Sequence, residues 1–451
     1  MKTNLSRRAF LRTSSGVAGA LVAANTIQME AESMAWPARP VPPSDRVRFG
    51  IIGVGMQGSQ LLTTSITLPG VECAVACDLY DGRHTLAKEI VSASLPTTRR
   101  YQELLENKEI DCVIAAVPDH WHRQVVVDTV NAGKDIYCEK PMSHTVADGF
   151  DMAAAQKRTG KSVQIGSQRV SSVIYAKAKE LLAQGAIGDL CLVEGSLGRN
   201  DPTGAWEYPP PPDLSTQTLD WDTWQGTAPK RAFDPLLFAR WRCWKEYGTG
   251  VAGDLLVHMI SGILFALNLN EPPKRAMAMG GILRWKDGRN MPDVHASLFE
   301  YGNLPIYARL NLGTESPEVV RFQGAKGYIE VTENAVTHVP QPGVDTAPSY
   351  YATHSFPRAM REEYLKQWDA EHDPVPGQEP LAETTTYHGV SYDDVKPHLF
   401  RFFEAVRTRK PVVEDAVFGN HAALACHMAN ESYFRKSAVL FDAASKSIKS
   451  A

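Results

Sequence analysis

The chain has 451 residues, of which 43% are hydrophobic and 22% are charged, a composition typical of a globular protein with two or three domains. Its 47 basic and 51 acidic residues give a formal net charge of −4, which argues against a nucleic-acid-binding surface. The sequence holds no apolar run of the ~20 residues that span a bilayer, and its seven cysteines are scattered. We therefore expect no membrane span, no disulfide framework and no metal site.

The N-terminus carries a twin-arginine pattern. Arg7 and Arg8 precede Phe10 and Leu11, and a weakly apolar stretch follows over residues 14–27. This pattern resembles a bacterial Tat signal, and the alternative is a disordered basic tail. A proline-rich segment then leads to residue 44. We expect residues 1–44 to be a signal and linker outside the fold, and the protein to use the Tat export machinery and to be periplasmic or otherwise exported.

Residues 45–166 alternate between short apolar runs and helix-like segments. The apolar runs are predicted as strands, and the segments between them as helices. The expected strands are 47–52, 71–77, 111–117 and 135–138, and the expected helices include 81–91 and 120–132. Such alternation predicts β-α-β units around a parallel sheet, as in a Rossmann domain.

Residues 167–440 have a different pattern, which predicts an α+β domain with a large, mainly antiparallel open sheet. Its expected strands follow one another through short turns, at 276–285, 294–301, 305–312, 319–322 and 328–331. Helices are predicted at 171–184, 254–267, 393–407 and 416–435. The Trp-rich stretch 201–244 is predicted as an insertion, and the polar stretch 333–392 as an arm or lid.

A glycine-rich turn follows the first expected strand. Gly53, Gly55 and Gly58 form Gly-x-Gly-x-x-Gly, with Met56 and Gln57 inside the motif, and Asp78 lies 20 residues after its last glycine. This context is the dinucleotide-binding fingerprint, because the glycines let backbone N–H groups approach a pyrophosphate and the acid accepts ribose hydroxyls. Asp78 favours NAD, whereas the nearby Arg83 leaves NADP open.

A second motif, Glu139-Lys140-Pro141, follows the strand 135–138. The carboxyl ends of parallel strands face the ligand crevice, so Lys140 is expected near the nicotinamide. A lone lysine is more often a solvated surface charge, and the neighbouring glutamate and proline are what make this one a candidate for proton transfer.

The glycine motif, Asp78, Glu139-Lys140-Pro141 and the later Asp254-x-x-x-His258 together resemble the glucose–fructose oxidoreductase / inositol dehydrogenase (Gfo/Idh/MocA) family, over about residues 46–435. The resemblance implies substrate-binding and proton-transfer roles for Lys140, Asp254 and His258. It also implies that the open sheet forms the interface of a homodimer or homotetramer. The chain has Leu256 and Ser261 where the family often has Gly and Asp, which puts the substrate contacts in doubt.

Asp254 and His258 are four residues apart, so a regular helix would place them on one face. We expect a histidine oriented by this carboxylate, beside Lys140, to take the proton of a substrate hydroxyl. The alternative is an N-capping aspartate followed by a core histidine. Further expected cofactor contacts are Pro118, His120, His122, Glu139 and Gln168, and Arg169 is an expected substrate contact. The tryptophans of 201–244 either stack on a sugar or pin the loop.

These features predict an NAD(P)-dependent oxidoreductase that acts on a hydroxyl of a sugar, glycoside or cyclitol. The periplasm offers little free dinucleotide, so an exported enzyme is expected to hold its cofactor tightly and to recycle it internally. Two alternatives stay open: an NAD-dependent glycosidase or lyase that acts through a transient keto-sugar, and a noncatalytic sugar-binding protein.

Overall fold

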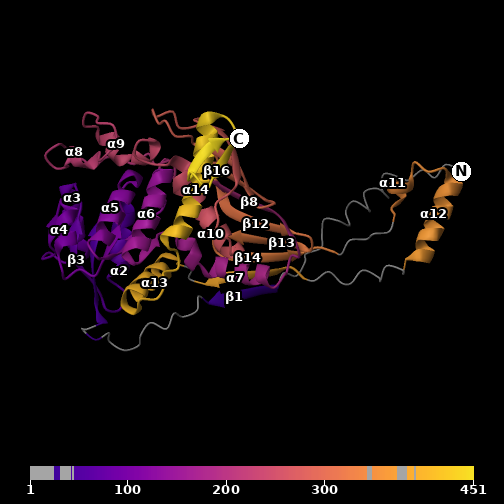
Figure 1. The fold of residues 1–451 in the computed structure, drawn as a ribbon, viewed down its shortest axis with the longest axis horizontal. Helices are drawn as coiled ribbons and strands as arrows, with labels where there is room; N and C mark the ends of the chain where they lie inside the picture. The colour runs from indigo at the N-terminus through magenta and orange to yellow at the C-terminus, as the bar shows by residue number, and fades with distance from the viewer. Residues whose placement is uncertain (1–24, 31–41, 43–44, 343–347, 373–382, 391–392) are drawn as a thin grey trace, which may run out of the picture.

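Two β-sheets organise the protein, whose computed structural model describes residues 25–30, 42, 45–342, 348–372, 383–390 and 393–451 (Figure 1). The twin-arginine residues lie outside the described residues, as does most of the expected signal. Figure 1 shows the six-stranded sheet with its helices at one end of the molecule, the large second sheet beside it, and an arm that extends from the second sheet.

The first sheet is parallel throughout, in the order β4-β3-β2-β5-β6-β7. Every residue of β5, β6 and β7 is buried, and all of them except Asp135 and Gln164 are hydrophobic, as expected for strands that are covered on both faces. The strands are β2 (Val47–Ile52), β3 (Val71–Cys77), β4 (Thr97–Thr98), β5 (Cys112–Ala115), β6 (Asp135–Cys138) and β7 (Val163–Ile165). The helices are α2 (Met56–Ser65), α3 (Asp81–Ile90), α4 (Tyr101–Glu106), α5 (Asp119–Asn131) and α6 (Val146–Thr159). Because β3 and β5 flank β2, the strand order reverses there, and this reversal opens a crevice at the carboxyl ends of the strands.

Two helices from the end of the chain pack on this first sheet, although we assigned their residues to the second domain. They are α13 (Val395–Thr408) and α14 (Ala416–Arg435). Leu399, Phe402 and Phe403 of α13 join the core beneath β2, where the rings of Phe403 and Phe49 have centroids 5.6 Å apart. The nucleotide-binding half is therefore completed by residues far away in the sequence.

The second sheet has eleven strands in the order β1-β15-β14-β13-β12-β8-β11-β10-β9-β16-β17. All of its pairs are antiparallel except β1–β15 and β8–β11, which confirms the predicted fold class. The strands are β1 (Asn25–Glu30), β8 (Leu190–Gly198), β9 (Arg275–Gly281), β10 (Val294–Tyr301), β11 (Leu304–Asn311), β12 (Ser316–Gly324), β13 (Gly327–Thr332), β14 (Ala335–Pro340), β15 (Thr385–Val390), β16 (Val439–Asp442) and β17 (Ser447–Ser450). The helices α7 (Val173–Ala183) and α10 (Val257–Leu267) share an apolar core with α14 and one face of this sheet.

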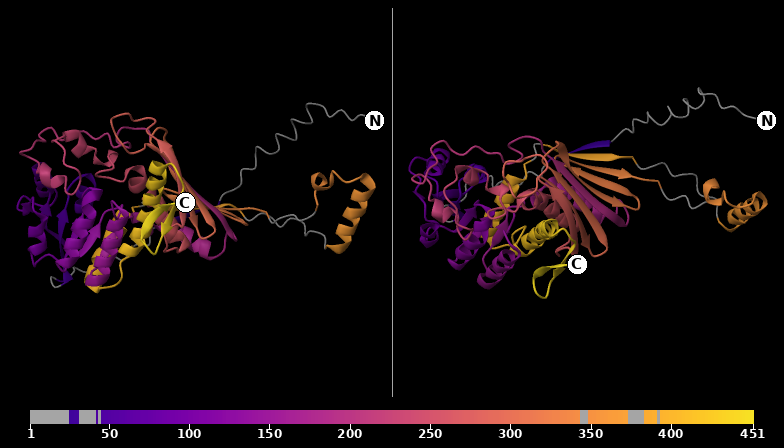
Figure 2. Two further views of the ribbon diagram at one scale, coloured as in Figure 1. Left: turned by 45° about the horizontal axis from the view of Figure 1, so that its top comes forward. Right: turned by 90° about the horizontal axis from the view of Figure 1, so that it is seen from above.

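Three segments differ from the sequence-based expectation. β1 joins the sheet edge, although residues 1–44 were expected outside the fold, and β16 and β17 form an unpredicted hairpin. The expected arm 333–392 contributes its two ends, β14 and β15, to the sheet, and its helices lie between these two strands in the chain. Figure 2 shows its short helices, α11 (Tyr350–Thr353) and α12 (Arg358–Glu371), standing apart from both sheets.

The insertion that follows β8 covers the crevice of the first sheet. It holds the short helices α8 (Trp221–Trp224) and α9 (Pro235–Ala239), which lie above α3 and α5 in Figure 1. The Trp221 and Trp224 rings stack at 4.9 Å and form a small core with Tyr80 of the first domain. The tryptophans thus pin this loop, and Trp206, Trp224 and Trp241 also line the cavity below it.

Candidate active site

The glycine-rich turn between β2 and α2 has the backbone that a pyrophosphate requires. Gly53 has a φ of +88°, which few other residues adopt, and a Cβ on Gly58 would lie only 2.0 Å from the Gly53 carbonyl oxygen. Gly55 begins α2 without a side-chain cap, so the first N–H groups of this helix have no side-chain acceptor at the cap. A turn that requires glycine at positions 53 and 58, at an uncapped helix N-terminus, fits a dinucleotide phosphate.

Asp78 is fixed at the end of β3, beside this turn. One carboxylate oxygen accepts a hydrogen bond from the backbone N–H of Val54 at 2.8 Å, and the other accepts from Tyr80 at 3.0 Å. The guanidinium of Arg83 lies 3.4 Å from the carboxylate. Asp78, Arg83, Arg99 and other residues line a cavity of about 520 Å³, whose position beside the turn fits the adenosine half of a dinucleotide.

A second cavity, of about 350 Å³, adjoins the first, and most of the predicted catalytic residues line it. Gly55, Met56, Gln57, Pro118 and Glu139 come from the first domain together with Lys140, whereas Asp254 and His258 come from the second. Gly53, Asp78 and Pro118 line the adjoining cavity. The fold therefore brings together two sequence motifs that are more than a hundred residues apart.

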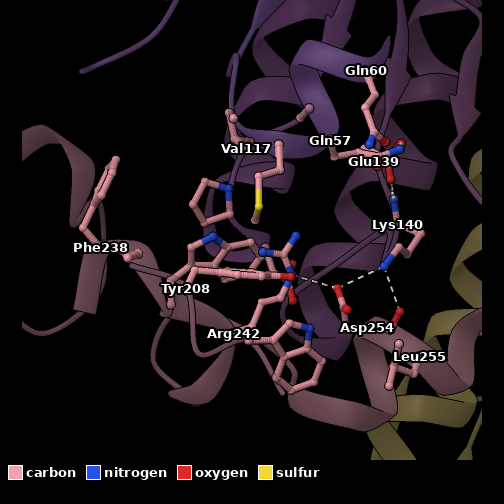
Figure 3. Close-up of a pocket in the computed structure, with 18 of the residues that line it drawn as sticks. Gln57, Gln60, Val117, Glu139, Lys140, Tyr208, Phe238, Arg242, Asp254 and Leu255 are labelled. Atoms are coloured by element: carbon pink, nitrogen blue, oxygen red, sulfur yellow. Dashed lines mark hydrogen bonds and ion pairs between the residues drawn. The ribbon is translucent and has the colours of Figure 1, made fainter. Parts of the chain in front are cut away.

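Lys140 and Asp254 connect the two domains across this cavity (Figure 3). The Lys140 ammonium donates to the Asp254 backbone carbonyl at 2.8 Å and to its carboxylate at 2.9 Å. The Arg242 guanidinium donates to the same carboxylate oxygen at 3.0 Å. Burial raises the pKa of Asp254, but the two cations outweigh this effect and hold its pKa well below the usual range, so the carboxylate is ionised.

Asp254 does not orient His258, contrary to our expectation. A π-helical turn, Ala252–Leu256, precedes α10 and widens the backbone at Asp254, and the carboxylate is taken by Lys140 and Arg242. Among the described residues no hydrogen bond joins Asp254 to His258. Asp254 is not the N-cap of α10 either, since that residue is Leu256.

His258 lies on the cavity wall as a neutral imidazole. Burial lowers its pKa well below the usual range, and the positive charges of Lys140, Arg169 and Arg199 lower it further. In the described part of the chain its ring nitrogens make no hydrogen bond, so one of them is free to accept a proton from a bound molecule.

Three predicted cofactor contacts, His120, His122 and Gln168, do not line either cavity. The ring nitrogens of the buried His122 lie 2.7 and 2.9 Å from the Pro141 and Val117 carbonyl oxygens, and those of His120 lie 3.0 and 3.3 Å from the Trp224 and Tyr247 carbonyl oxygens. A neutral imidazole donates to one of its two neighbours through its single N–H. Both histidines therefore stabilise the backbone around the cavities, because their ring nitrogens face backbone carbonyl oxygens and not the cavity space. The side-chain amide of Gln168 donates to Glu139 and thus supports it from behind.

Arg169 also lies outside both cavity linings. Its guanidinium forms ion pairs with Glu318 at 2.9 Å and with Asp394 at 3.1 Å. Arg169 therefore joins β12 to the start of α13, and it acts on the site through its charge near His258.

Several cavity residues were missed by the sequence analysis. They include Gln60, Arg199, Tyr208, Phe238 and Arg242. All except Gln60 belong to or border the irregular insertion, which has no periodicity that would indicate a buried face. One sequence feature could have indicated Arg242 as a site residue, namely its position next to Trp241. In the structure the Arg242 guanidinium lies 4.3 Å from the centroid of the Trp241 indole.

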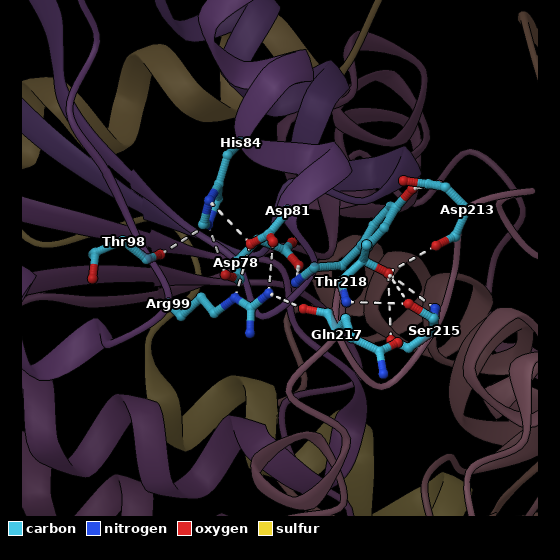
Figure 4. A network of polar contacts seen from close by, with 10 residues as sticks. Asp78, Asp81, His84, Thr98, Arg99, Asp213, Ser215, Gln217 and Thr218 are labelled. Carbon is cyan, nitrogen blue, oxygen red and sulfur yellow. Dashed lines mark hydrogen bonds and ion pairs between the residues drawn. The ribbon is translucent and has the colours of Figure 1, made fainter.

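Polar contacts fasten the insertion to the first domain at the rim of the adenosine-side cavity (Figure 4). The Tyr80 hydroxyl donates to Asp213, and Arg99 donates to Asp81 at 2.6 and 2.8 Å and to the Gln217 carbonyl at 3.0 Å. A bridge between Tyr80 and Leu219 completes the contact. The insertion thus closes over the place where a dinucleotide would lie.

The described residues include no group of three or more His, Cys, Asp or Glu side chains arranged to hold a metal ion. They also include no helix with the length and apolarity needed to cross a bilayer.

Comparisons with known proteins agree with this site. Residues 47–167 match the Gfo/Idh/MocA model, which describes an oxidoreductase family with an NAD-binding Rossmann fold. Inositol 2-dehydrogenase of Salmonella typhimurium is 33% identical over 151 residues, which are 33% of this chain and 45% of that protein. Glycosyl hydrolase family 109 protein 1 of Shewanella sp. strain MR-4 is 29% identical over 209 residues, 42% of this chain and 44% of that protein. Each match thus spans less than half of the relative's length.

Among solved structures, a levoglucosan dehydrogenase in complex with NADH and levoglucosan has a TM-score of 0.62 at 18% identity, covering 88% of this chain and 99% of that one. This likeness shows a shared fold. Together the comparisons show that residues 47–167 resemble the NAD-binding Rossmann domain of Gfo/Idh/MocA oxidoreductases and that the described chain shares the fold of a sugar dehydrogenase.

Proposed function

We propose that this chain oxidises a carbinol carbon of a sugar, glycoside or cyclitol with a bound nicotinamide dinucleotide. The observation that carries the proposal is the contact of the Lys140 ammonium with Asp254 at 2.8 and 2.9 Å. Lys140, Asp254 and His258 line one cavity, to which both domains contribute, and this arrangement supports a proton-transfer site. The sugar dehydrogenases among the comparisons support the substrate class.

The residues of the cavity have separate roles in the proposed oxidation. Lys140 donates a hydrogen bond to the substrate hydroxyl oxygen, and the neutral imidazole of His258 accepts the hydroxyl proton. Asp254, kept ionised by Lys140 and Arg242, holds the lysine in place. The Trp206 and Trp241 walls exclude water and offer faces for the C–H groups of a sugar. The dinucleotide, when bound, supplies the hydride acceptor.

Gly53, Gly55 and Gly58 would hold the pyrophosphate, and Asp78 the adenosine ribose. We expect NAD rather than NADP, because an ionised Asp78 repels a phosphate on the ribose. The polar contacts between the insertion and the first domain support a cofactor that is retained between turnovers.

A redox-neutral glycosidase or lyase on the same site is the second candidate. The resemblance to a family 109 glycosyl hydrolase favours it. A transient ketone makes the neighbouring C–H acidic, so the group on the next carbon can leave before the ketone is reduced again. The two candidates share Lys140, His258 and the cofactor, and they differ in the net product.

The experiment is to release and identify the dinucleotide from purified protein, and then to add sugars and glycosides to the oxidised holoenzyme. A dehydrogenase accumulates reduced nicotinamide after the sugar is added, and it releases no aglycone. A glycosidase releases the aglycone with no net reduction. A protein that binds no dinucleotide, or whose nicotinamide never changes with any sugar, contradicts both candidates.

We also propose export of the folded enzyme through the twin-arginine signal, and self-association through the open sheet. Met277, Met279 and Leu298 are exposed on the sheet, at 48%, 68% and 49%, which supports an oligomer. Cell fractionation with Arg7→Lys and Arg8→Lys together tests the first proposal, and light scattering tests the second. Retention of export by the double variant, or a monomer at high concentration, would contradict them.

A further inference from the structure

One cation in the substrate cavity stands apart from the others. Arg199 follows the last residue of β8, where its backbone N–H donates to the Asn311 carbonyl at 2.9 Å and anchors it to β11. Its side chain lines the cavity wall on the second-domain side. Among the described residues its guanidinium has neither a hydrogen-bond acceptor nor an ion-pair partner.

The other cations near this wall are all occupied. Lys140 and Arg242 both bind the Asp254 carboxylate. Arg169 lies between Glu318 and Asp394, and Arg83 faces Asp78 and the glycine-rich turn. Among the described cations of this cavity, Arg199 is therefore the one without a carboxylate partner in the protein.

The electrostatic balance of the cavity points the same way. Lys140 and Arg242 share one carboxylate, Asp254, and His258 is neutral. The Glu139 and Asp119 carboxyls are buried and accept hydrogen bonds from Gln57 and Thr249. None of the described carboxylates of the cavity therefore pairs with Arg199, and a neutral sugar would leave its charge without a partner.

Arg199 is also close to the reacting groups. Its positive charge lowers the pKa of His258, after the larger effect of burial, and it acts on the Tyr208 hydroxyl in the same direction. A group held by Arg199 would therefore lie in the same cavity as the proton acceptor His258.

We propose that the substrate carries a carboxylate, as in a uronic acid or its glycoside, and that Arg199 binds it. This inference rests on the proposed function and narrows its substrate class. A guanidinium matches the planar carboxylate with two parallel hydrogen bonds. A phosphate monoester carries up to two charges and is usually met by more than one cation, whereas only one guanidinium is available here.

The test measures calorimetric binding of methyl glucuronosides and galacturonosides to the oxidised holoenzyme, against their neutral parent glycosides and the corresponding sugar phosphates. We expect at least one uronoside to bind ~10–100-fold more tightly than its neutral parent, because a hydrogen-bonded charge pair is worth this much. In Arg199→Met the uronoside and its neutral parent should bind within about twofold of each other. Arg199→Lys should keep part of the preference for the uronoside.

Arg158→Met, an exposed arginine on α6 that bonds only to Asn131 among the described residues, is the matched control and should keep the full preference. Retention of the dinucleotide by each variant shows that it folds. Equal binding of uronosides and neutral parents, an unchanged preference in Arg199→Met, or tighter binding of the sugar phosphates would each overturn the inference.

Reduction of the bound nicotinamide is followed in the same samples. Neutral glycosides that are oxidised without any advantage for uronosides contradict this inference alone. A nicotinamide that stays oxidised with every compound, and with no aglycone released, contradicts the proposed function.

Discussion

Lys140 donates hydrogen bonds to both the backbone carbonyl and the carboxylate of Asp254, at 2.8 and 2.9 Å, and so joins the end of β6 to the π-helical turn before α10. The carbonyl is within reach because the backbone is wider at this turn. One side chain thereby fixes the position of the second domain's reactive helix relative to the nucleotide-binding sheet.

Replacing this lysine should remove turnover without removing the cofactor. In Lys140→Met, Asp254 keeps Arg242 as its partner, so the fold should survive. The substrate hydroxyl loses its cationic neighbour, and we expect kcat to fall ~100- to 10,000-fold. Steady-state kinetics and the dinucleotide content of the purified variant measure both effects. Unchanged turnover would contradict the assigned role.

Gly58→Ala should abolish dinucleotide binding. A Cβ at this position would lie 2.0 Å from the Gly53 carbonyl oxygen, so the turn must open. Gly281→Ala is the control, because its Cβ would meet only the flexible Leu283 side chain, at 3.2 Å. We expect purified Gly58→Ala to carry little dinucleotide and Gly281→Ala to resemble the parent. A fully loaded Gly58→Ala protein would show that the phosphate lies elsewhere.

Tyr80→Phe should loosen the cover over the cofactor. The Tyr80 hydroxyl donates to Asp213 of the insertion, and the pKa of Tyr80 is raised to about 12 by burial and by that carboxylate. Without the hydroxyl we expect the dinucleotide to dissociate ~10-fold faster, as the loss of one charge-assisted hydrogen bond allows. Stopped-flow release measures this rate, with Tyr351→Phe in the exposed arm as the control. Equal release rates would exclude a retaining role for the insertion.

His398 should make stability depend on pH. It is fully buried on α13, its ring nitrogens bond to Ser171 and Ile165, and burial lowers its pKa from 6.5 to about 4. Between these two values the unfolded chain binds more protons at this residue than the folded chain. Its contribution to the free energy of unfolding therefore rises with pH by up to ~1.4 kcal/mol per unit and levels off above about 6.5.

Urea unfolding of the parent and of His398→Gln over this range measures the contribution. The free energies of unfolding of the parent and of His398→Gln should converge toward acid pH. In the parent, keeping His398 unprotonated costs more free energy as the pH falls, and the glutamine has no such cost. His372→Gln, at the exposed end of the arm, is the control. Parallel curves for the parent and His398→Gln would contradict the assigned cause.

Most of the fold could be predicted from local sequence patterns. The strand at 294–301 and the helix at 416–435 have the predicted bounds, because alternating burial along β10 and a long run of helix formers in α14 are both visible in the sequence. The packing of α13 under β2 could not be predicted from local sequence patterns, because an apolar helix face can pack against either sheet or against another helix. β1 was missed because a short edge strand depends on its neighbour for most of its hydrogen bonds.

The candidate site divides along the same line. Gly53, Asp78 and Lys140 follow strands, so the parallel sheet brings them to one edge. The partnership of Asp254 was mispredicted because a regular helical spacing was assumed where the backbone forms a π turn. Arg199 and Arg242 lie in or beside irregular chain. Only the three-dimensional structure shows that Arg242 is paired with Asp254 and that Arg199 has no partner among the described residues.

The central claim is that Lys140 and His258 remove a hydroxyl proton while a bound nicotinamide is reduced. Rapid mixing of the oxidised holoenzyme with a uronoside or its parent sugar, followed by nicotinamide fluorescence, tests it most directly. We expect rapid reduction, up to one nicotinamide per site, in the parent protein, and a burst slowed at least ~100-fold in Lys140→Met. Sugar conversion with a nicotinamide that stays oxidised throughout, or an equally fast burst in Lys140→Met, would contradict it.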